Sequence, residues 1–347
     1  SITITNYHYP IPDLNTSIFL LYRVVGTFFF TKPMDLVETL KSLWSWLIHN
    51  KKGLRSVNFP DSSSNLPDAA DIFYSRAFLN QPNVEEEFST NCQPLWRMRV
   101  WKNYIFVSGD NNSIKRIDPA THICEDEKET ISGNSPDDFD VTVSGRFIYV
   151  DWQERTVCRL LGNSVTEEIF KLRGWKPWGI CSSISGDILV AMRSDDTKQA
   201  RVVGFREAKK TREYKLDQKG HPLYDSPAFV AENRNQDVCV SDVHHNRVTV
   251  VDVKGTFKFH YHGKQAAATY PTFYPKGIAT NSQANILIAD QENSCVHILD
   301  PIGQLVSFIS TGCSLMEPYC LGVGSEDELY VGEYHQGKVK KIRYLQW

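Results

Sequence analysis

Residues 275–300 read PKGIATNSQANILIADQENSCVHILD, and this stretch contains three short apolar segments in succession. A proline and a glycine open the first segment, as they do where a sharp turn leads into a new strand. The second segment, Ile286-Leu-Ile-Ala-Asp290, ends on an acid, and the third, Cys295-Val-His-Ile-Leu-Asp300, alternates with a period of two. That period is typical of half-buried β-strands, so the stretch predicts three consecutive strands.

The middle segment of this stretch recurs six times along the chain. The copies are Ile105-Phe-Val-Ser-Gly-Asp110, Ile148-Tyr-Val-Asp151, Ile188-Leu-Val-Ala-Met192, Val238-Cys-Val-Ser-Asp242, Ile286-Leu-Ile-Ala-Asp290 and Leu329-Tyr-Val-Gly-Glu333. A repeat of roughly 40 to 45 residues with four short strands is the size of one propeller blade, whose sheet can bury its faces only against neighbouring blades. The sequence therefore predicts an all-β fold, a six-bladed β-propeller.

The ends of the repeat array predict how the ring closes. The last copy has only three strands before Trp347, whereas residues 84–92 look extended and have no blade of their own. We expect residues 84–92 to supply the missing outer strand, so that the propeller covers residues 84–347. Residues 56–83 are interpreted as a linker, and residues 1–55 as a segment of unknown role with a short amphipathic helix over 34–47.

Composition and charge narrow the possible partners. The formal net charge is −3, and residues 94–347 hold 31 Lys and Arg against 32 Asp and Glu, so the basic excess of an RNA-binding domain is missing. The most apolar run, residues 18–30, is too short for a membrane span of about 20 residues. None of the eight cysteines forms a C-x-x-C pair, which favours reduced thiols and a cytoplasmic location.

Candidate binding residues follow from the expected strand order. In propellers the loops before the innermost strand and those between the second and third strands share one face, and we expect a partner to bind there. The candidates mix aromatic residues with hydrogen-bond donors, as interfaces do. They are Trp175, Lys176, Trp178, Arg193, Lys198, His244, His245, Arg247, Tyr274, Lys276, Asn293, Tyr319, Tyr334 and His335.

Several of these residues also have a purely structural interpretation. The strand-end acids Asp110, Asp151, Asp242 and Asp290 recur at one position, which favours capping of the turn that follows each of them. For Trp175 and Trp178, packing between blades and binding of a partner are equally favoured interpretations. His244 with His245, and His260 with His262, lack an acid or thiol at a fixed spacing, so no metal site is expected.

No catalytic site is expected from the sequence. It contains no motif of a nucleophilic, metalloprotease or nucleotide-binding enzyme in a fitting context. The innermost strands, such as 179–183 and 277–280, carry mainly small or apolar residues, which could not hold a catalytic cation on the propeller axis. We therefore expect a binding protein without a cofactor.

Five segments, taken in order, resemble a known family. They are Arg173-Gly-Trp-Lys-Pro-Trp-Gly-Ile-Cys181, Ser185-Gly-Asp-Ile-Leu-Val190, Ala231-Glu-Asn-Arg-Asn-Gln-Asp-Val-Cys-Val-Ser-Asp242, Val296-His-Ile-Leu-Asp-Pro-Ile-Gly-Gln304 and Gly337-Lys-Val-Lys-Lys-Ile342. Residues 94–347 resemble the C-terminal NHL-repeat propeller of tripartite-motif (TRIM) proteins, in particular the large sets found in molluscs. The zinc-binding RING and B-box modules of that family, which need closely spaced cysteines, have no counterpart here.

This resemblance implies a function in recruitment. Family propellers bring a target protein to a ubiquitin ligase or, in some members, bind RNA. We therefore expect a protein-interaction scaffold that binds a protein partner, with RNA binding as the alternative.

Overall fold

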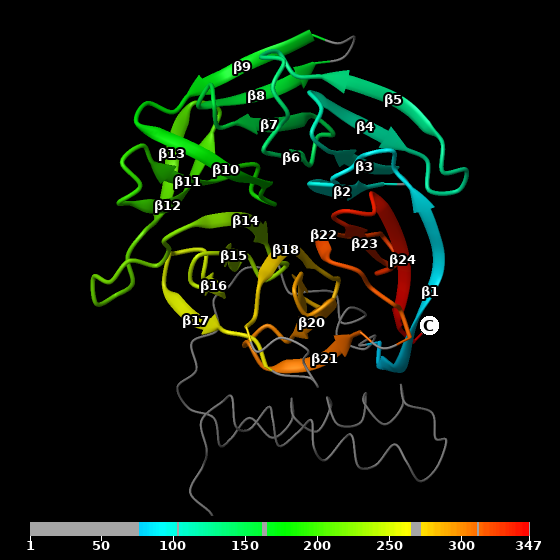
Figure 1. Cartoon of the computed structure of the whole chain (residues 1–347). Coiled ribbons are helices and arrows are strands. Elements are labelled where there is room, and N and C mark those ends of the chain that lie inside the picture. The colour runs from blue at the N-terminus through cyan, green and yellow to red at the C-terminus, as the bar shows by residue number, and fades with distance from the viewer. Residues whose placement is uncertain (1–75, 103, 162–164, 265–271, 311, 347) are drawn as a thin grey trace, which may run out of the picture. The chain divides into compact units, whose positions relative to one another are not determined.

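The computed structural model describes residues 76–102, 104–161, 165–264, 272–310 and 312–346. These residues form six four-stranded antiparallel sheets arranged as a ring (Figure 1). The described residues contain no helix, so the predicted all-β, six-bladed propeller is confirmed. The segment 1–55 with its helix over 34–47 lies outside the described residues, as does most of the proposed linker.

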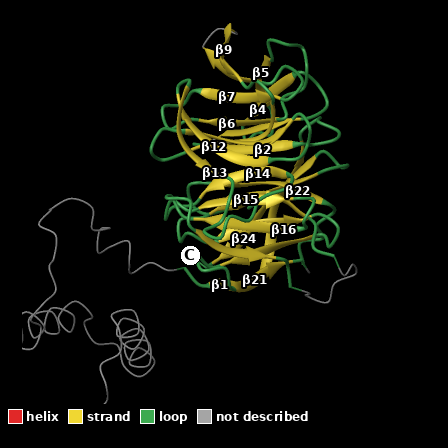
Figure 2. Ribbon diagram, turned by 90° about the vertical axis from the view of Figure 1, so that its left-hand side faces the viewer, coloured by secondary structure: helices red, strands yellow, loops and turns green. Residues whose placement is uncertain are grey.

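Each blade is a meander whose first strand lies nearest the axis. From inside outward, blades 1 to 3 are β2 (Arg97–Trp101), β3 (Tyr104–Ser108), β4 (Ser113–Ile117) and β5 (Cys124–Glu129); β6 (Asp138–Val141), β7 (Phe147–Asp151), β8 (Thr156–Leu161) and β9 (Val165–Lys171); and β10 (Trp175–Ser182), β11 (Ile188–Ser194), β12 (Ala200–Arg206) and β13 (Lys209–Tyr214). Blades 4 to 6 are β14 (Pro227–Glu232), β15 (Val238–Asp242), β16 (Arg247–Val251) and β17 (Phe257–Tyr261); β18 (Pro275–Thr280), β19 (Ile286–Asp290), β20 (Cys295–Leu299) and β21 (Leu305–Ile309); and β22 (Pro318–Val323), β23 (Leu329–Glu333), β24 (Lys338–Leu345) and β1 (Phe78–Ser89). The connecting loops gather at the two faces of the ring (Figure 2).

The hydrophobic core consists of wedges between blades. The described residues form six buried clusters, and each combines side chains from two neighbouring blades. The cluster between blades 1 and 2, for example, joins Phe106 and Ile114 to Phe139, Tyr149 and Leu160. A four-stranded sheet cannot bury both faces by itself, so every blade depends on both neighbours.

The ring is closed by β1, which pairs antiparallel with β24 as the fourth strand of blade 6. The strand begins at Phe78, six residues before the expected start, because Phe78 pairs with Leu345 and packs against Tyr344. It ends at Ser89, since Asn91 adopts a left-handed conformation with a φ of 55°. Residues 78–83 therefore belong to the propeller and not to a linker.

Opposite charges face each other along the closing pair of strands. Lys338 Nζ lies 2.5 Å from Glu87 Oε1, and Lys341 Nζ lies 3.1 Å from Glu86 Oε1. His122 of blade 1 lies 3.2 Å from the other oxygen of Glu86. Cross-strand pairs of this kind favour one register, because a slip would place like charges opposite each other.

The charge pairing at the closure predicts acid sensitivity. The hydrogen bond and charge of Lys338 lower the pKa of Glu87, while for Glu86 partial burial raises the pKa but Lys341 and His122 outweigh it and lower it overall. A lowered folded-state pKa contributes stability above the unfolded pKa of about 4.3, and this contribution is lost as pH falls through the folded value. The free energy of unfolding, measured with urea between about pH 3 and pH 7, should depend less on pH in the double variant Glu86→Gln/Glu87→Gln than in the parent. At pH 7 the double variant should lose no more than about 1 kcal/mol of this free energy, because both side chains are partly exposed. Glu207→Gln, on an exposed turn, is the control; equal slopes in all three proteins would contradict the assignment.

Close approach of the innermost strands predicts a steric requirement for glycine. A Cβ added at Gly277 would lie 2.8 Å from the carbonyl oxygen of Tyr319 and 2.9 Å from the Cα of Cys320. Both are backbone atoms of the next blade, which cannot move without shifting the whole strand. Gly277→Ala is therefore expected to lower the free energy of unfolding by about 1–3 kcal/mol, measured by urea denaturation.

Gly220→Ala is the comparison, because its added Cβ would meet nothing within 4 Å although its φ is positive. That substitution is expected to cost about 1–2 kcal/mol through its left-handed backbone alone. The loss in Gly277→Ala has no such contribution, because the φ of Gly277 is not positive, and it measures the steric clash. A Gly277→Ala protein as stable as the parent would show that neighbouring blades can separate freely.

Candidate binding site on the propeller axis

Four of the six innermost strands share an irregularity next to the axis. The antiparallel register shifts within Pro177–Gly179 of β10, Pro227–Phe229 of β14, Pro275–Ile278 of β18 and Pro318–Cys320 of β22. Such a β-bulge leaves an extra residue outside the ladder and redirects its side chain. The residues that follow these prolines are Trp178, Ala228, Lys276 and Tyr319, and all four line one cavity.

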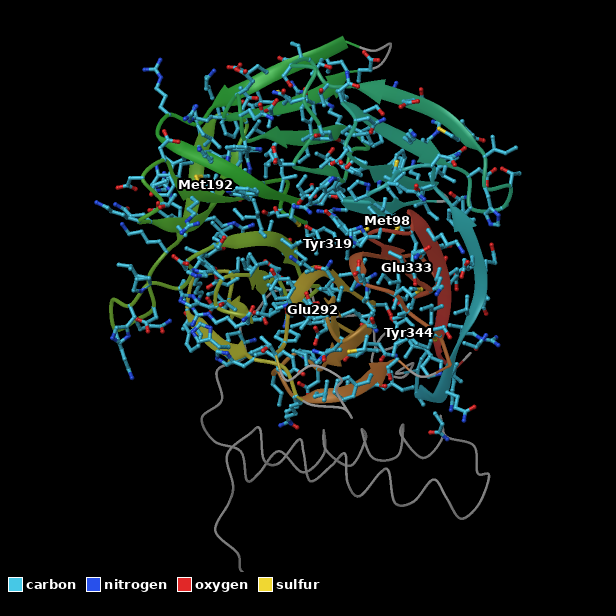
Figure 3. All side chains as sticks on the ribbon, in the orientation of Figure 1. Met98, Met192, Glu292, Tyr319, Glu333 and Tyr344 are labelled. Atoms are coloured by element: carbon cyan, nitrogen blue, oxygen red, sulfur yellow. The ribbon has the colours of Figure 1, made fainter. Side chains whose placement is uncertain are left out.

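This axial cavity has a volume of about 430 Å³. Its walls include loops that precede innermost strands, at Asp137 and Ser226, and loops between second and third strands, at Trp152 and Val243. The expectation that these two kinds of loop share one face is therefore confirmed, and that face is called the cavity face below. Figure 3 labels Tyr319 near the centre of the ring and Glu333 of the same blade farther out.

Aromatic rings form two groups around the cavity. Trp152 and Trp178 stack with centroids 5.7 Å apart and planes 9° from parallel. Tyr319 of blade 6 makes edge contacts with Trp96, just before blade 1, at 5.7 Å and with Phe229 of blade 4 at 5.6 Å. Edge-to-face and offset stacking are the favourable geometries for such rings, so these contacts stabilise the aromatic part of the wall.

A network of buried ion pairs lies along the innermost strands of blades 1 and 2. Arg97 Nε is 3.2 Å and Arg99 Nη2 is 3.0 Å from Asp138 Oδ1, and Arg99 Nε is 3.4 Å from Asp140 Oδ1. Asp138 also accepts a hydrogen bond from the Ile180 amide. The prediction that the innermost strands carry mainly small or apolar residues is wrong for these two blades, because two arginines and two aspartates lie on β2 and β6. Both carboxylates are matched by guanidinium groups, so the network serves as a structural bridge between blades.

Lys276 is the cation of the cavity without an acidic partner. No described carboxylate lies within ion-pair distance of its Nζ, which instead sits 4.3 Å from the ring centroid of Tyr274 and 5.2 Å from that of Tyr319. Burial lowers the pKa of Lys276 to about 8, with the charge of Arg97 acting in the same direction and Glu292 opposing it. The ammonium group is therefore held in a partly desolvated position where an incoming anion would stabilise it.

Asp137 is the complementary case on the opposite wall. Its Oδ2 accepts a 2.7 Å hydrogen bond from the Trp152 amide, but no described cation forms an ion pair with it. Burial raises the pKa of Asp137 to about 7, although the hydrogen bond from Trp152 and the charge of Arg97 lower it. An under-solvated acid and an under-solvated base in one cavity mark a functional site better than either does alone.

The candidate residues predicted from sequence divide into three groups. Trp178, Lys276 and Tyr319 line the cavity, while Lys176 and Tyr334 contact its aromatic residues Trp152 and Tyr319, and the ring centroid of Tyr274 lies 4.3 Å from Lys276 Nζ. His335 packs against Tyr334 and lies 3.5 Å from Glu317, and Lys198 is exposed. The remaining candidates make internal contacts.

These internal contacts assign structural positions to the remaining candidates. The guanidinium of Arg201 lies 3.6 Å above the ring of Trp175, which packs against the cluster between blades 2 and 3. Asn293 Nδ2 donates to Asp290 and to the Thr272 carbonyl. The others pair with acids: Arg193 and His244 with Asp225, and His245 and Arg247 with Asp242.

Capping of the next turn is confirmed for Asp151, whose carboxylate accepts a hydrogen bond from the Glu154 amide. Asp242 and Asp290 instead accept from the amides of Ser226 and Tyr274, which directly precede the innermost strands of their blades. Asp110 differs, since its carboxylate accepts from the indole nitrogen of Trp96 at 2.5 Å.

Sequence reasoning missed Trp96, Asp137 and Trp152. For Asp137 and Trp152, a sequence signal can be found in retrospect. Asp137 directly follows Pro136, just as the cavity residues of four other blades follow a proline. Trp152 directly follows the strand-end acid of blade 2, the position that Val243 holds in blade 4.

One buried group has the composition of a metal site. Asp290, Cys295 and His297 bring potential ligand atoms within 4.8 Å of one another. Tyr261 Oη lies 2.8 Å from His297 Nδ1, and His297 Nε2 lies 3.2 Å from Asp290 Oδ2. Burial raises the pKa of the Cys295 thiol to about 12, and beside it Tyr261, His297 and Asp290 form a buried hydrogen-bonded chain.

Comparisons with known proteins show the fold alone. No family model matches the chain, and no curated protein matches it in sequence. The chain is similar to a solved structure of catalytically inactive virginiamycin B lyase from Staphylococcus aureus with quinupristin, at 16% identity over 76% of this chain and 88% of that one, with a TM-score of 0.55.

Two further solved structures are similar at 11% identity and a TM-score of 0.57. One is a gluconolactonase from Xanthomonas campestris, with 78% of this chain and 96% of that one covered. The other is a calcium-binding regucalcin from Agrobacterium tumefaciens, with 74% and 92% covered. Such identities support the propeller architecture, while the resemblance to tripartite-motif proteins stays a prediction. Among the described residues, none forms a helix long and apolar enough to cross a membrane.

The environment of Lys276 predicts an unusual titration. With ¹³C-methylated lysines followed by NMR, the Lys276 signal should titrate with a midpoint near pH 8, because burial disfavours its charged form. Lys276→Arg identifies the signal by its absence. A Lys276 midpoint above pH 10 would mean that the ammonium is fully hydrated and that the cavity is not the desolvated site described here.

Proposed function

We propose that the propeller is a recognition module that binds a protein partner through the cavity face. The observation that carries this proposal is the Trp152–Trp178 stack beside the cavity, with Trp178 38% exposed. Large aromatic side chains held rigidly at the solvent boundary are the commonest energetic centres of protein interfaces. Tyr334 continues this surface across Tyr319, with ring centroids 4.8 Å apart.

The charges of the cavity face favour protein over RNA. Arg193 lies 3.6 Å from Asp225, Arg247 lies 3.3 Å from Asp242, and Arg97 is paired with Asp138. Cations already neutralised in this way release few counterions from a phosphate backbone, and that release drives most nucleic-acid binding. RNA binding therefore remains the alternative outcome of the test below.

We further propose that the propeller recruits its protein partner in the way that a TRIM propeller does. The repeat segments that resemble that family support it, and we propose that the bound protein is a target or regulator in ubiquitination. The eight free thiols support a cytoplasmic location. We propose no catalytic activity for this chain, since the acids of β6 are already paired with Arg97 and Arg99.

Removing one exposed ring should test this function. The full-length chain, crosslinked in cytosol and recovered, is expected to retain a specific protein partner after nuclease treatment. Trp178→Ala should then lower the affinity for that partner at least ten-fold, about 1.4 kcal/mol or more, because a partly exposed indole at the interface centre is lost.

Ile302→Ala is the matched control. Ile302 is 64% exposed and lies in the turn between β20 and β21, on the opposite face from the cavity. Equal loss of affinity in both variants would place the interface elsewhere. A partner that disappears on nuclease treatment, with binding that falls steeply with salt, would replace the protein-recruiting function by RNA binding.

A further inference from the structure

We propose that the axial cavity is a binding site for a small zwitterionic molecule with a flat apolar body, of the class of aromatic amino acids and their short peptides. This inference goes beyond the recognition of a protein partner and does not depend on it. Its basis is the position of an unpaired acid and an unpaired base on opposite walls of an aromatic cavity.

The size and lining of the cavity suit a small ligand. A volume of about 430 Å³ falls within the range of about 300–1,000 Å³ found for small-molecule sites. Arg97 lies at the cavity wall with its guanidinium 4.0 Å from the ring of Phe229 and paired with Asp138. The exposed ring of Trp178 and the edge of Tyr319 offer surfaces against which a flat ring can pack.

The two unpaired charges of the cavity lie on opposite sides of the ring. Asp137 precedes the innermost strand of blade 2, whereas Lys276 lies on that of blade 5, three blades away. In a six-bladed ring these blades face each other across the axis. Within the described parts of the chain, neither side chain has an ion-pair partner, so each would gain one from a ligand that carries both charges.

The same arrangement disfavours other ligand classes. A divalent cation needs several oxygen ligands, but Asp110 already accepts a hydrogen bond from Trp96, and the positive charges of Arg97 and Lys276 line the same cavity. A phosphate would meet one unpaired cation together with the carboxylates of Asp137 and Asp110, which repel a doubly charged anion. A single carboxylate at Lys276 and a single ammonium group at Asp137 match the charges that are present.

Three probes that share an indole ring test the proposal on the full-length chain. They are L-tryptophan, indole-3-propionate, which lacks the ammonium group, and tryptamine, which lacks the carboxylate. Ligand-observed NMR and calorimetry at pH 7.4 should give a tryptophan affinity about ten-fold or more above that of either single-charge probe, since each charge-assisted hydrogen bond contributes to binding.

Two variants separate the two charges. Lys276→Met is expected to lower tryptophan affinity about ten-fold and leave tryptamine affinity unchanged, whereas Asp137→Asn should lower the affinities of tryptophan and tryptamine and spare indole-3-propionate. Lys219→Met, an exposed lysine in the loop after β13, is the control. Thermal unfolding shows whether each variant keeps its fold, and the probe that a variant should spare confirms an intact cavity.

The proposal is overturned if no probe binds at millimolar concentration, if the three affinities are equal, or if Lys276→Met leaves tryptophan binding unchanged. Protein capture that depends on Trp178, combined with no binding of any probe, would leave the proposed recognition function standing and remove this one. Probe binding without protein capture would do the reverse.

Discussion

The pairing of β1 with β24 is the constraint on which the rest of the propeller depends. It joins residues more than 200 positions apart and turns a row of blades into a ring. Without it, β24 would be an open edge, and the wedge between blades 6 and 1 would lose Phe88 from its core. Because each blade is buried only by its neighbours, a gap at one interface exposes two sheets, and closure therefore stabilises all six interfaces together.

Ring closure also creates the axial cavity, since the innermost strands can surround a shared space only when the ring is complete. The bulges of four blades then decide what faces this space. At each bulge the residue after the proline leaves the regular ladder, so Trp178, Lys276 and Tyr319 reach the axis together. The glycines that follow Trp178 and Lys276 permit the close approach of neighbouring strands, with carbonyl oxygens 2.7–2.8 Å from where a Cβ would stand.

The blades could be predicted from sequence because their signals are local. Period-two alternation, a turn and a strand-end acid all lie within one repeat, and the unpaired third strand at the C-terminus pointed to an N-terminal partner strand. The cavity could not be predicted in the same way, because its contacts join different blades: Arg97 meets Asp138, and Trp152 meets Trp178. Trp175 and Trp178 illustrate the limit, since one packs against the cluster between blades 2 and 3 and the other lines the cavity, and these contacts lie in different blades.

The distribution of satisfied and unsatisfied charges supports the cavity as the functional site. Arg99 and Asp138 neutralise each other deep between blades, and the charges of β1 and β24 are matched across the strands. Lys276 and Asp137 depart from this pattern, because neither has an ion-pair partner among the described residues, and burial shifts the pKa of each in the direction that favours its neutral form. Two partly desolvated groups reduce stability, and a fold that pairs most of its other buried charges would gain from pairing these as well. Their persistence on opposite walls of one cavity is therefore better explained by a ligand that pairs with both than by any requirement of the propeller itself.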